Sequence, residues 1–200
     1  GAALDVLRAE AGVLDATFSP DGTMLASCGG DSAVTLWDVA SRQVLRVLRG
    51  HVGVVLSVGF SPGGDRLASG GADRSVRIWD ARDGTELSVL RGHEDWIGSV
   101  CFDRDGARLA SCSRDGTLRV WDADAPASPS ILRAASGWVH AVACSPDGSR
   151  VAAGVAIGAI QIWDASNGLE LSLRQVGEWP VRCLAYSPDG AALASGAEDG

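Results

Sequence analysis

Lysine is absent from this chain, and all 17 of its basic residues are arginine. Asparagine and tyrosine occur once each, at Asn167 and Tyr186, whereas alanine, glycine and arginine are abundant. Codons for those three residues are favoured in a genome rich in G and C, and no binding surface requires such a pattern. We therefore expect a bacterial source.

Positive charge is scarce as well, because 25 acidic residues face 17 basic ones and give a net charge of −8. A nucleic-acid partner requires a basic face, so we expect no nucleic acid. No stretch approaches the roughly 18 apolar residues of a membrane-spanning helix, and no basic start precedes an apolar segment. We expect neither a membrane partner nor a signal peptide.

Cysteine is limited to five residues, an odd number, and none lies in a CxxC pair. This pattern fits neither a disulfide framework nor a zinc site. We interpret the cysteines as reduced thiols, which predicts a cytoplasmic protein without a metal. No two glycines are separated by a single residue, which excludes a GxGxxG phosphate-binding loop. We expect no cofactor.

What the chain does contain is an internal repeat that spans residues 1–200. Trp-Asp dipeptides recur at a constant spacing of 42 residues, beginning at Trp37, Trp79, Trp121 and Trp163. Gly50–His51 and Gly92–His93 are also 42 residues apart, and five turn tetrapeptides of the Ser-Pro-Asp-Gly type keep the same step. A period of this length indicates a repeat architecture.

Each unit resolves into four short strands. In the second unit these are expected at residues 54–60, 65–70, 75–80 and 85–91, separated by turns rich in Gly, Pro and Asp. Alternation is imperfect, since Leu56, Val58 and Phe60 share one face while Val55 occupies the other. Such strands suit an antiparallel sheet that is buried on both faces between similar neighbours.

The Gly-His and Trp-Asp dipeptides in a 42-residue unit resemble the WD-repeat (WD40) β-propeller family. The resemblance implies an all-β propeller of four-stranded antiparallel blades, in which each repeat starts with the outer strand of the preceding blade. The chain holds about 4.8 units, and residues 2–8 match an outer strand. We expect a propeller segment incomplete at both ends, with the remaining blades in the same longer chain, and not a closed five-blade ring.

The resemblance also implies buried hydrogen-bonded tetrads of His, Ser, Asp and Trp. By repeat position the two complete sets are His51, Ser69, Asp73 and Trp79, and His93, Ser111, Asp115 and Trp121. A buried imidazole can donate to Asp and accept from Ser, which leaves Ser to pair with the indole N–H. Other units depart from the set. In the fourth unit Ala135, Ala153 and Ile157 stand at the His, Ser and Asp positions, and only Trp163 is kept. The first unit has Ala9 at the His position and keeps Ser27, Asp31 and Trp37, and the last has Gly177 at the His position and keeps Ser195 and Asp199.

Ser, His and Asp together also raise the possibility of a hydrolase. A catalytic serine must be exposed beside an oxyanion hole, whereas this serine is expected in mid-strand and the trio occurs twice. We interpret the trio as architecture and predict a non-catalytic scaffold for protein–protein interaction, part of a larger signalling or regulatory protein. The alternatives are a propeller hydrolase with a site in the central channel, and a structural spacer.

Three tryptophans lie outside the Trp-Asp dipeptides, where the chain enters the first strand of a blade. Aromatic and arginine residues are the usual anchors of interfaces. We therefore expect a protein or peptide partner on one propeller face, at Trp96, Trp138, Trp179, Arg114 and Glu198. In the alternative interpretation these rings only cover the ends of the blades. His140 is expected to be a rim or packing residue.

Overall fold

The computed structural model describes residues 7–9, 11–125, 128–135 and 137–198, and every regular element in these ranges is a β-strand. The strands form four four-stranded antiparallel sheets and one two-stranded sheet. This confirms the expected all-β fold with blades of four strands. No helix in the described part of the chain is long and apolar enough to span a membrane.

Within each blade the strands follow in chain order, so that each sheet is a meander. The first two blades comprise β1 (Val13–Phe18), β2 (Met24–Gly29), β3 (Ala33–Asp38), β4 (Val44–Arg49), β5 (Val55–Phe60), β6 (Arg66–Gly71), β7 (Ser75–Asp80) and β8 (Glu86–Arg91). The strands expected for the second unit match β5 to β8 to within one residue at each end.

The third and fourth blades repeat this pattern, and the last sheet has two strands. They comprise β9 (Ile97–Phe102), β10 (Arg108–Ser113), β11 (Thr117–Asp122), β12 (Ser130–Arg133), β13 (Val139–Cys144), β14 (Arg150–Val155), β15 (Ala159–Asp164), β16 (Glu170–Gln175), β17 (Val181–Tyr186) and β18 (Leu193–Ala197). The outer strand expected at residues 2–8 is not observed at residues 7 and 8, and residues 2–6 lie outside the described residues.

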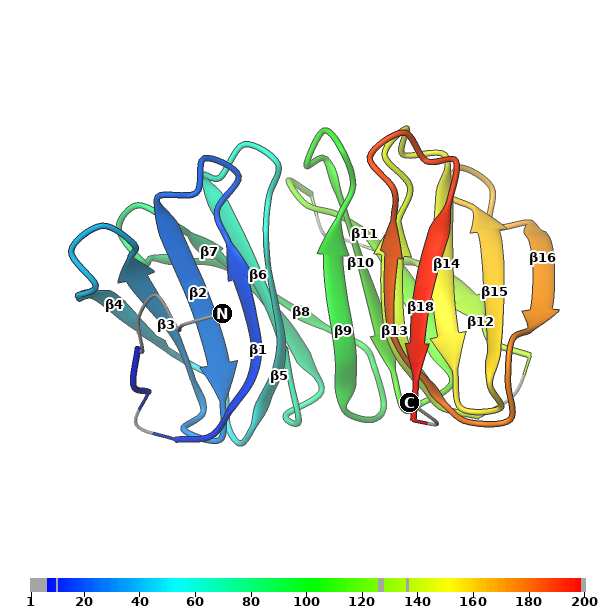
Figure 1. The fold of residues 1–200 in the computed structure, drawn as a ribbon, viewed down its shortest axis with the longest axis horizontal. Coiled ribbons are helices and arrows are strands. Elements are labelled where there is room, and N and C mark those ends of the chain that lie inside the picture. The colour runs from blue at the N-terminus through cyan, green and yellow to red at the C-terminus, as the bar shows by residue number, and fades with distance from the viewer. Residues whose placement is uncertain (1–6, 10, 126–127, 136, 199–200) are drawn as a thin grey trace, which may run out of the picture.

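The blades stand side by side around an arc (Figure 1), with β4 at one end of the view and β16 at the other. The first strands of successive blades contact one another, from β1 to β5, β9, β13 and β17, and so form the inner wall of the arc. Each first strand begins at the end of the blade that we call the loop face. It ends at a Ser-Pro-Asp-Gly type turn at the opposite end.

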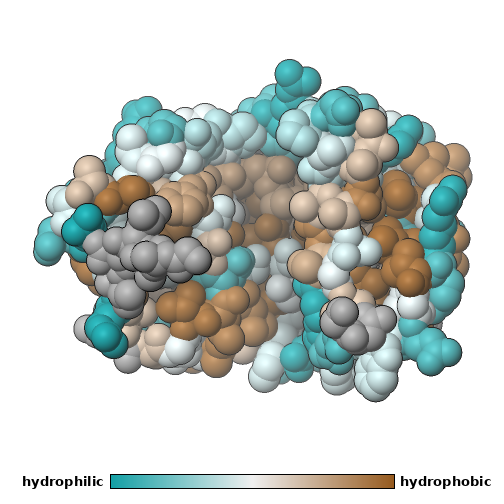
Figure 2. Space-filling model, in the orientation of Figure 1, coloured by the Kyte–Doolittle hydropathy of each residue, from teal (hydrophilic) through white to brown (hydrophobic). Residues whose placement is uncertain are grey.

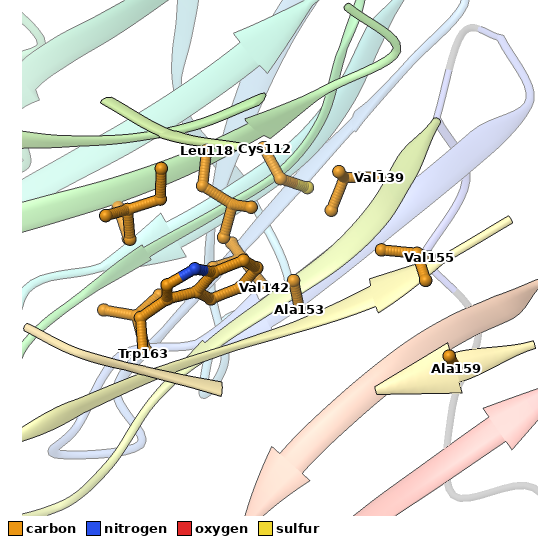
Figure 3. Packing of buried hydrophobic residues seen from close by; sticks show 11 residues of the cluster. Cys112, Leu118, Val139, Val142, Ala153, Val155, Ala159 and Trp163 are labelled. Carbon is orange, nitrogen blue, oxygen red and sulfur yellow. The ribbon is translucent and has the colours of Figure 1, made fainter. Parts of the chain in front are cut away.

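The hydrophobic core lies between the blades. In each cluster the tryptophan of one blade packs with the third and fourth strands of the blade before it, as Trp79 does with Leu36 and Leu48. Trp163 packs in the same way with Leu118 and Leu132 (Figure 3). Neighbouring blades therefore stabilise one another, as expected for a repeat architecture.

A shift of one residue in strand pairing recurs near the start of every first strand. In the first blade Val13 pairs with Gly29 and Asp15 with Cys28, which leaves Leu14 without a pairing position. The same shift in the other sheets singles out Leu56, Gly98, His140 and Arg182. A β-bulge re-aims a side chain, and all five of these residues line the central channel.

Candidate functional site

The second blade holds its four tetrad residues in one hydrogen-bonded chain. His51 Nδ1 lies 3.0 Å from a carboxylate oxygen of Asp73, and Nε2 lies 2.8 Å from Ser69 Oγ. Trp79 donates its indole N–H to the same Oγ at 2.8 Å. Ser69 Oγ therefore accepts from Trp79 and donates to Nε2, which assigns the imidazole proton to Nδ1.

The third blade repeats this geometry. His93 Nδ1 lies 2.8 Å from Asp115 Oδ2, Nε2 lies 2.9 Å from Ser111 Oγ, and Trp121 donates to that Oγ at 2.9 Å. Asp115 also accepts from the Thr117 hydroxyl at 2.7 Å. Each chain ties the loop before the first strand to the second and third strands.

Close approach explains the glycine before each histidine. A Cβ on Gly50 would lie 2.7 Å from Arg77 Nη1, and a Cβ on Gly92 would lie 2.6 Å from Arg119 Nη1. Gly92 also adopts φ +149°, which disfavours any side chain. A side chain at either position would have to displace an arginine side chain, and at Gly50 it would also lie 3.0 Å from the Trp79 ring.

Burial sets the ionisation of the tetrads. It lowers the pKa of His51 and His93, although Asp73 and Asp115 act in the opposite direction. Burial also raises the pKa of Asp115, but hydrogen bonds from Thr117, the Glu94 N–H and His93 outweigh it and bring that pKa to about 2. Each tetrad thus pairs a neutral imidazole with a carboxylate.

The serines of both tetrads are closed to any substrate. Ser69 and Ser111 are 0% exposed, and each hydroxyl already bonds to a histidine and a tryptophan. A nucleophile needs an open approach and a free oxyanion site, neither of which this position offers.

The first and fourth blades retain only parts of the set. Trp37 donates to Ser27 Oγ at 2.8 Å, and Asp31 accepts from the Ala33 N–H at 3.4 Å. The fourth blade keeps Trp163 in its core. In the last sheet Ser195 is exposed, and Asp199 lies outside the described residues.

Gln161 on β15 provides a link in the fourth blade that the sequence analysis did not identify. Its Oε1 accepts from the Ala135 N–H at 2.9 Å, and its Nε2 donates to Glu170 Oε2 at 2.6 Å. Gln161 occupies the repeat position of Arg77 and Arg119, and Ala135 occupies that of the histidines. The loop is thus tied to the sheet without a histidine.

On the loop face, Arg114 lies between two tryptophan rings. Its Cζ is 4.5 Å from the centroid of Trp96 and 5.0 Å from that of Trp138. Arg114 and Trp96 belong to the third blade and Trp138 to the fourth, so the contact crosses a blade interface. Trp96 and Trp138 remain 39% and 50% exposed. Both distances lie within the range of cation–π attraction.

A polar chain continues from Trp138 toward the last sheet. The Trp138 and His140 rings are nearly perpendicular with their centroids 6.1 Å apart, and Arg182 Nη1 lies 2.8 Å from His140 Nδ1. Arg182 Nε donates to Glu198 Oε1 at 2.7 Å. Burial, followed by the charges of Arg182 and Arg114, lowers the pKa of His140 to about 4. His140 therefore accepts from Arg182 as a neutral ring.

We call these six residues the Trp–Arg row: Trp96, Arg114, Trp138, His140, Arg182 and Glu198. The row brings together four of the five residues expected on the partner-binding face. Trp179 is also on this face and 54% exposed, but no contact joins it to the row among the described residues. It stands one position out of step, because Pro180 occupies the repeat position of Trp96 and Trp138.

The central channel is a cavity of about 310 Å³, lined by the first strands of all five sheets. Figure 2 shows a hollow between the two halves of the arc, with hydrophobic side chains in its depth. Asp15 and Ser57 in its wall accept from the Val58 and Val100 N–H groups of the next blade, at 2.9 and 3.2 Å. These polar groups join the blades together.

Ligands for a metal do not gather in the described ranges of the chain. There, no three His, Cys, Asp or Glu side chains are placed to hold an ion. The described part of the chain therefore shows no ligand set that would call for a metal cofactor.

Comparison with known proteins decides the family. The family described as "IFT122 first beta-propeller" matches residues 12–170, and the "WD domain, G-beta repeat" family matches residues 172–200. The chain belongs to the WD40-repeat β-propeller family. The resemblance drawn from the Trp-Asp and Gly-His dipeptides is thereby confirmed.

Two relatives match short segments of the chain. An uncharacterized WD repeat-containing protein, alr2800, of Nostoc sp. is 46% identical over 39 residues, which is 20% of this chain and 3% of that protein. The U5 small nuclear ribonucleoprotein 40 kDa protein of Pongo abelii is 39% identical over 49 residues, 24% of this chain and 14% of that protein. The matched segments span a small part of either relative.

Proposed function

We propose that this chain is a non-catalytic scaffold that binds a protein or peptide partner on its loop face. WD40 propellers serve in general as protein-interaction scaffolds, and membership of the family supports that role here. The burial of Ser69 and Ser111 supports a non-catalytic reading of the Ser-His-Asp trio.

The main support for a binding site at this place is the pair of half-exposed tryptophans, Trp96 and Trp138, on either side of Arg114. Tryptophan and arginine are the side chains most often found to dominate interface energies. Here they are held in position by the fold, because Arg114 N donates to Trp96 O at 3.0 Å and Ala156 N donates to Trp138 O at 2.9 Å. A preorganised surface loses less entropy when a partner binds.

The same proposal includes the longer protein to which this chain belongs and its location in the cell. We infer one propeller segment over residues 1–200, whose remaining blades belong to the same longer chain and whose partner is recognised for a signalling or regulatory purpose. A cytoplasmic location and a bacterial source fit the five free cysteines and the arginine-only composition. The net charge of −8 supports a protein partner over a nucleic acid.

The test is binding to an array of short peptides of varied composition, followed by fluorescence polarisation with the peptides retained. We expect the double variant Trp96→Ala/Trp138→Ala to lose at least about tenfold in affinity. Phe18→Ala is the matched control, because Phe18 is an aromatic residue 60% exposed at the opposite end of β1. Equal losses in both variants, or no peptide retained by the wild type, would overturn the proposal.

A further inference from the structure

Arg114 has its charge held in place but its hydrogen-bond donors unused. Among the described residues its guanidinium makes two ring contacts, with Trp96 and Trp138, and no side-chain hydrogen bond or ion pair. A guanidinium carries five N–H donors around its planar edge. Because the rings lie against the group, its edge is left for another molecule.

We propose that Arg114 binds a carboxylate side chain of the protein partner, so that the segment docking on the loop face carries an Asp or Glu at this point. The inference rests on the proposed function and names the chemistry of its partner. Arginine and carboxylate pair through two parallel hydrogen bonds, and a guanidinium fixed beforehand loses little freedom in forming them.

The neighbouring charges favour a single carboxylate over a polyanion. The other arginine of the row, Arg182, is already paired with Glu198, which leaves one free cation in the row. Glu94 and Asp95 lie in the loop before Trp96, and the Glu94 N–H bonds to Asp115 beside Arg114. These acidic side chains would repel an extended string of phosphates, whereas one carboxylate needs only the Arg114 edge.

The experiment compares acidic peptides from the array with the same peptides in which each Glu or Asp is replaced by Gln or Asn. We expect wild-type protein to prefer the acidic member of a pair by at least about tenfold, and Arg114→Gln to lose that preference. Arg104→Gln is the matched control, because Arg104 is exposed in the turn at the opposite end of the blade. Glu94→Gln should tighten binding.

The outcomes separate the two proposals. Peptides that bind through Trp96 and Trp138 with no acidic preference would overturn the carboxylate inference and leave the scaffold standing. A preference that persists in Arg114→Gln would also overturn it. Failure of every peptide to bind would overturn both.

A second inference rests on an independent pair of residues at the same blade interface. The Sγ atoms of Cys101 on β9 and Cys144 on β13 lie 2.7 Å apart, and both side chains are partly exposed. Residues 43 positions apart lie next to each other across successive first strands, as the hydrogen bond from the Val100 N–H to Ser57 Oγ also shows. The corresponding pairs are Thr17 with Phe60, Gly59 with Phe102, and Ala143 with Tyr186.

Both members of the pair thus depart from the repeat together. At the corresponding positions of the other interfaces the sequence has one small residue and one aromatic residue, whereas this interface has two cysteines. The structure points to a reversible disulfide between Cys101 and Cys144, formed by a peroxide. It would join the third and fourth blades, across which Trp96, Arg114 and Trp138 assemble.

The chemistry balances with a peroxide as the oxidant. The Cys101 thiol releases its proton to solvent, and the thiolate Sγ attacks a peroxide oxygen. The O–O bond breaks, a sulfenic acid forms, and the departing hydroxide takes up a proton from solvent to become water. Cys144 then attacks the Cys101 sulfur, the S–O bond breaks, and a second water leaves. The hydrogen bond with Cys101 and burial raise the pKa of the Cys144 thiol, which suits Cys144 to the second, resolving step.

The test is treatment of the folded chain with hydrogen peroxide, followed by unfolding, alkylation and mass spectrometry of the peptides. We expect a cross-link between the Cys101 and Cys144 peptides, three alkylated cysteines of the five, and return to five after reduction. Cys101→Ala should abolish the cross-link, whereas Cys183→Ala, at an exposed cysteine, should leave it. Five alkylated cysteines after peroxide, or a cross-link through Cys183, would overturn the inference.

Discussion

The indole N–H of Trp121 donates to Ser111 Oγ across 2.9 Å, from the third strand of its blade to the second. The same ring is 2% exposed and packs in a cluster with Ile78 and Leu90 of the preceding blade. One side chain therefore holds its own sheet together and attaches it to its neighbour. The stability of the third blade should depend strongly on it.

Trp121→Ala should lower the free energy of unfolding by about 3–5 kcal/mol, because it removes a large buried ring and leaves a cavity. Trp121→Phe should cost less, since an aromatic ring remains and the hydrogen bond to Ser111 accounts for about 1 kcal/mol. Urea unfolding followed by fluorescence measures both. Trp96→Ala should cost much less than Trp121→Ala, and equal losses would contradict the placement of Trp96 on the surface.

A serine-directed fluorophosphonate should not label the folded chain. Ser111 is fully buried, and its oxygen is shared between His93 and Trp121. Gel fluorescence or intact mass after incubation measures labelling, with an unrelated serine hydrolase as the positive control. Stoichiometric labelling that disappears in Ser111→Ala would contradict the structural interpretation of the tetrad.

Acid should destabilise the chain well before its carboxylates titrate. The pKa values of all three histidines, His51, His93 and His140, are lowered in the folded state from 6.5. The unfolded chain therefore binds more protons below pH 6.5, so their contribution is complete above that pH and is lost as the pH falls. His51 and His93 should each contribute a slope of up to about 1.4 kcal/mol per pH unit.

Urea unfolding between about pH 5 and 8 measures this slope. His140→Gln removes a histidine outside the tetrads and should reduce the slope while leaving the contribution of His51 and His93. A free energy of unfolding that is flat or rises on acidification through pH 6.5 would show that the buried imidazoles are charged. The free energy of unfolding should fall further below pH 3.8. Between that pH and about 2, the pKa of Asp115 in the folded chain, this carboxylate is protonated only in the unfolded chain.

Gln161→Leu should destabilise the fourth blade by about 1–3 kcal/mol, because it leaves the Ala135 N–H and the Glu170 carboxylate without their partner. Hydrogen exchange should show faster exchange at Ala135. Gln43→Leu is the matched control, since Gln43 is exposed. If the two variants unfold at the same urea concentration, Gln161 does not substitute for the missing histidine.

Much of the fold could be predicted because the same pattern of strands and turns occurs in each repeat of the sequence. The spacing of Trp37, Trp79, Trp121 and Trp163 locates every third strand, and a single turn type locates the ends of the first strands. The structure brings His51, Ser69, Asp73 and Trp79 together, because Ser69 and Trp79 lie in paired strands and the loop and turn that carry His51 and Asp73 keep fixed positions in the repeat. Position within the repeat is enough to find such residues.

The candidate site was less predictable, because its contacts cross from one repeat to the next. The placement of Arg114 between Trp96 and Trp138 depends on the distance between neighbouring blades, and the 42-residue spacing in the sequence does not determine that distance. Gln161 could not be identified from the repeat, because it stands at the position of Arg77 and Arg119 and not at the position of the histidines. It nevertheless ties the loop to the sheet, as the histidines do in the second and third blades. The relation of His140 to Arg182, exactly one period apart, was available in the sequence and was overlooked.

The recurring bulge makes the pairing of the strands independent of the side chain that the bulged residue presents to the channel. Leu14, Leu56, Gly98, His140 and Arg182 fall where strand pairing skips a residue, so pairing within the sheet does not fix their identity. Gly98 is constrained in another way, because a Cβ there would lie 3.0 Å from the Val139 carbonyl oxygen of the next blade. A leucine, a glycine and an arginine already occupy the same place in different blades. Outside the third blade, the lining of the channel can thus change at one residue per blade, and a new specificity can arise there without a new fold.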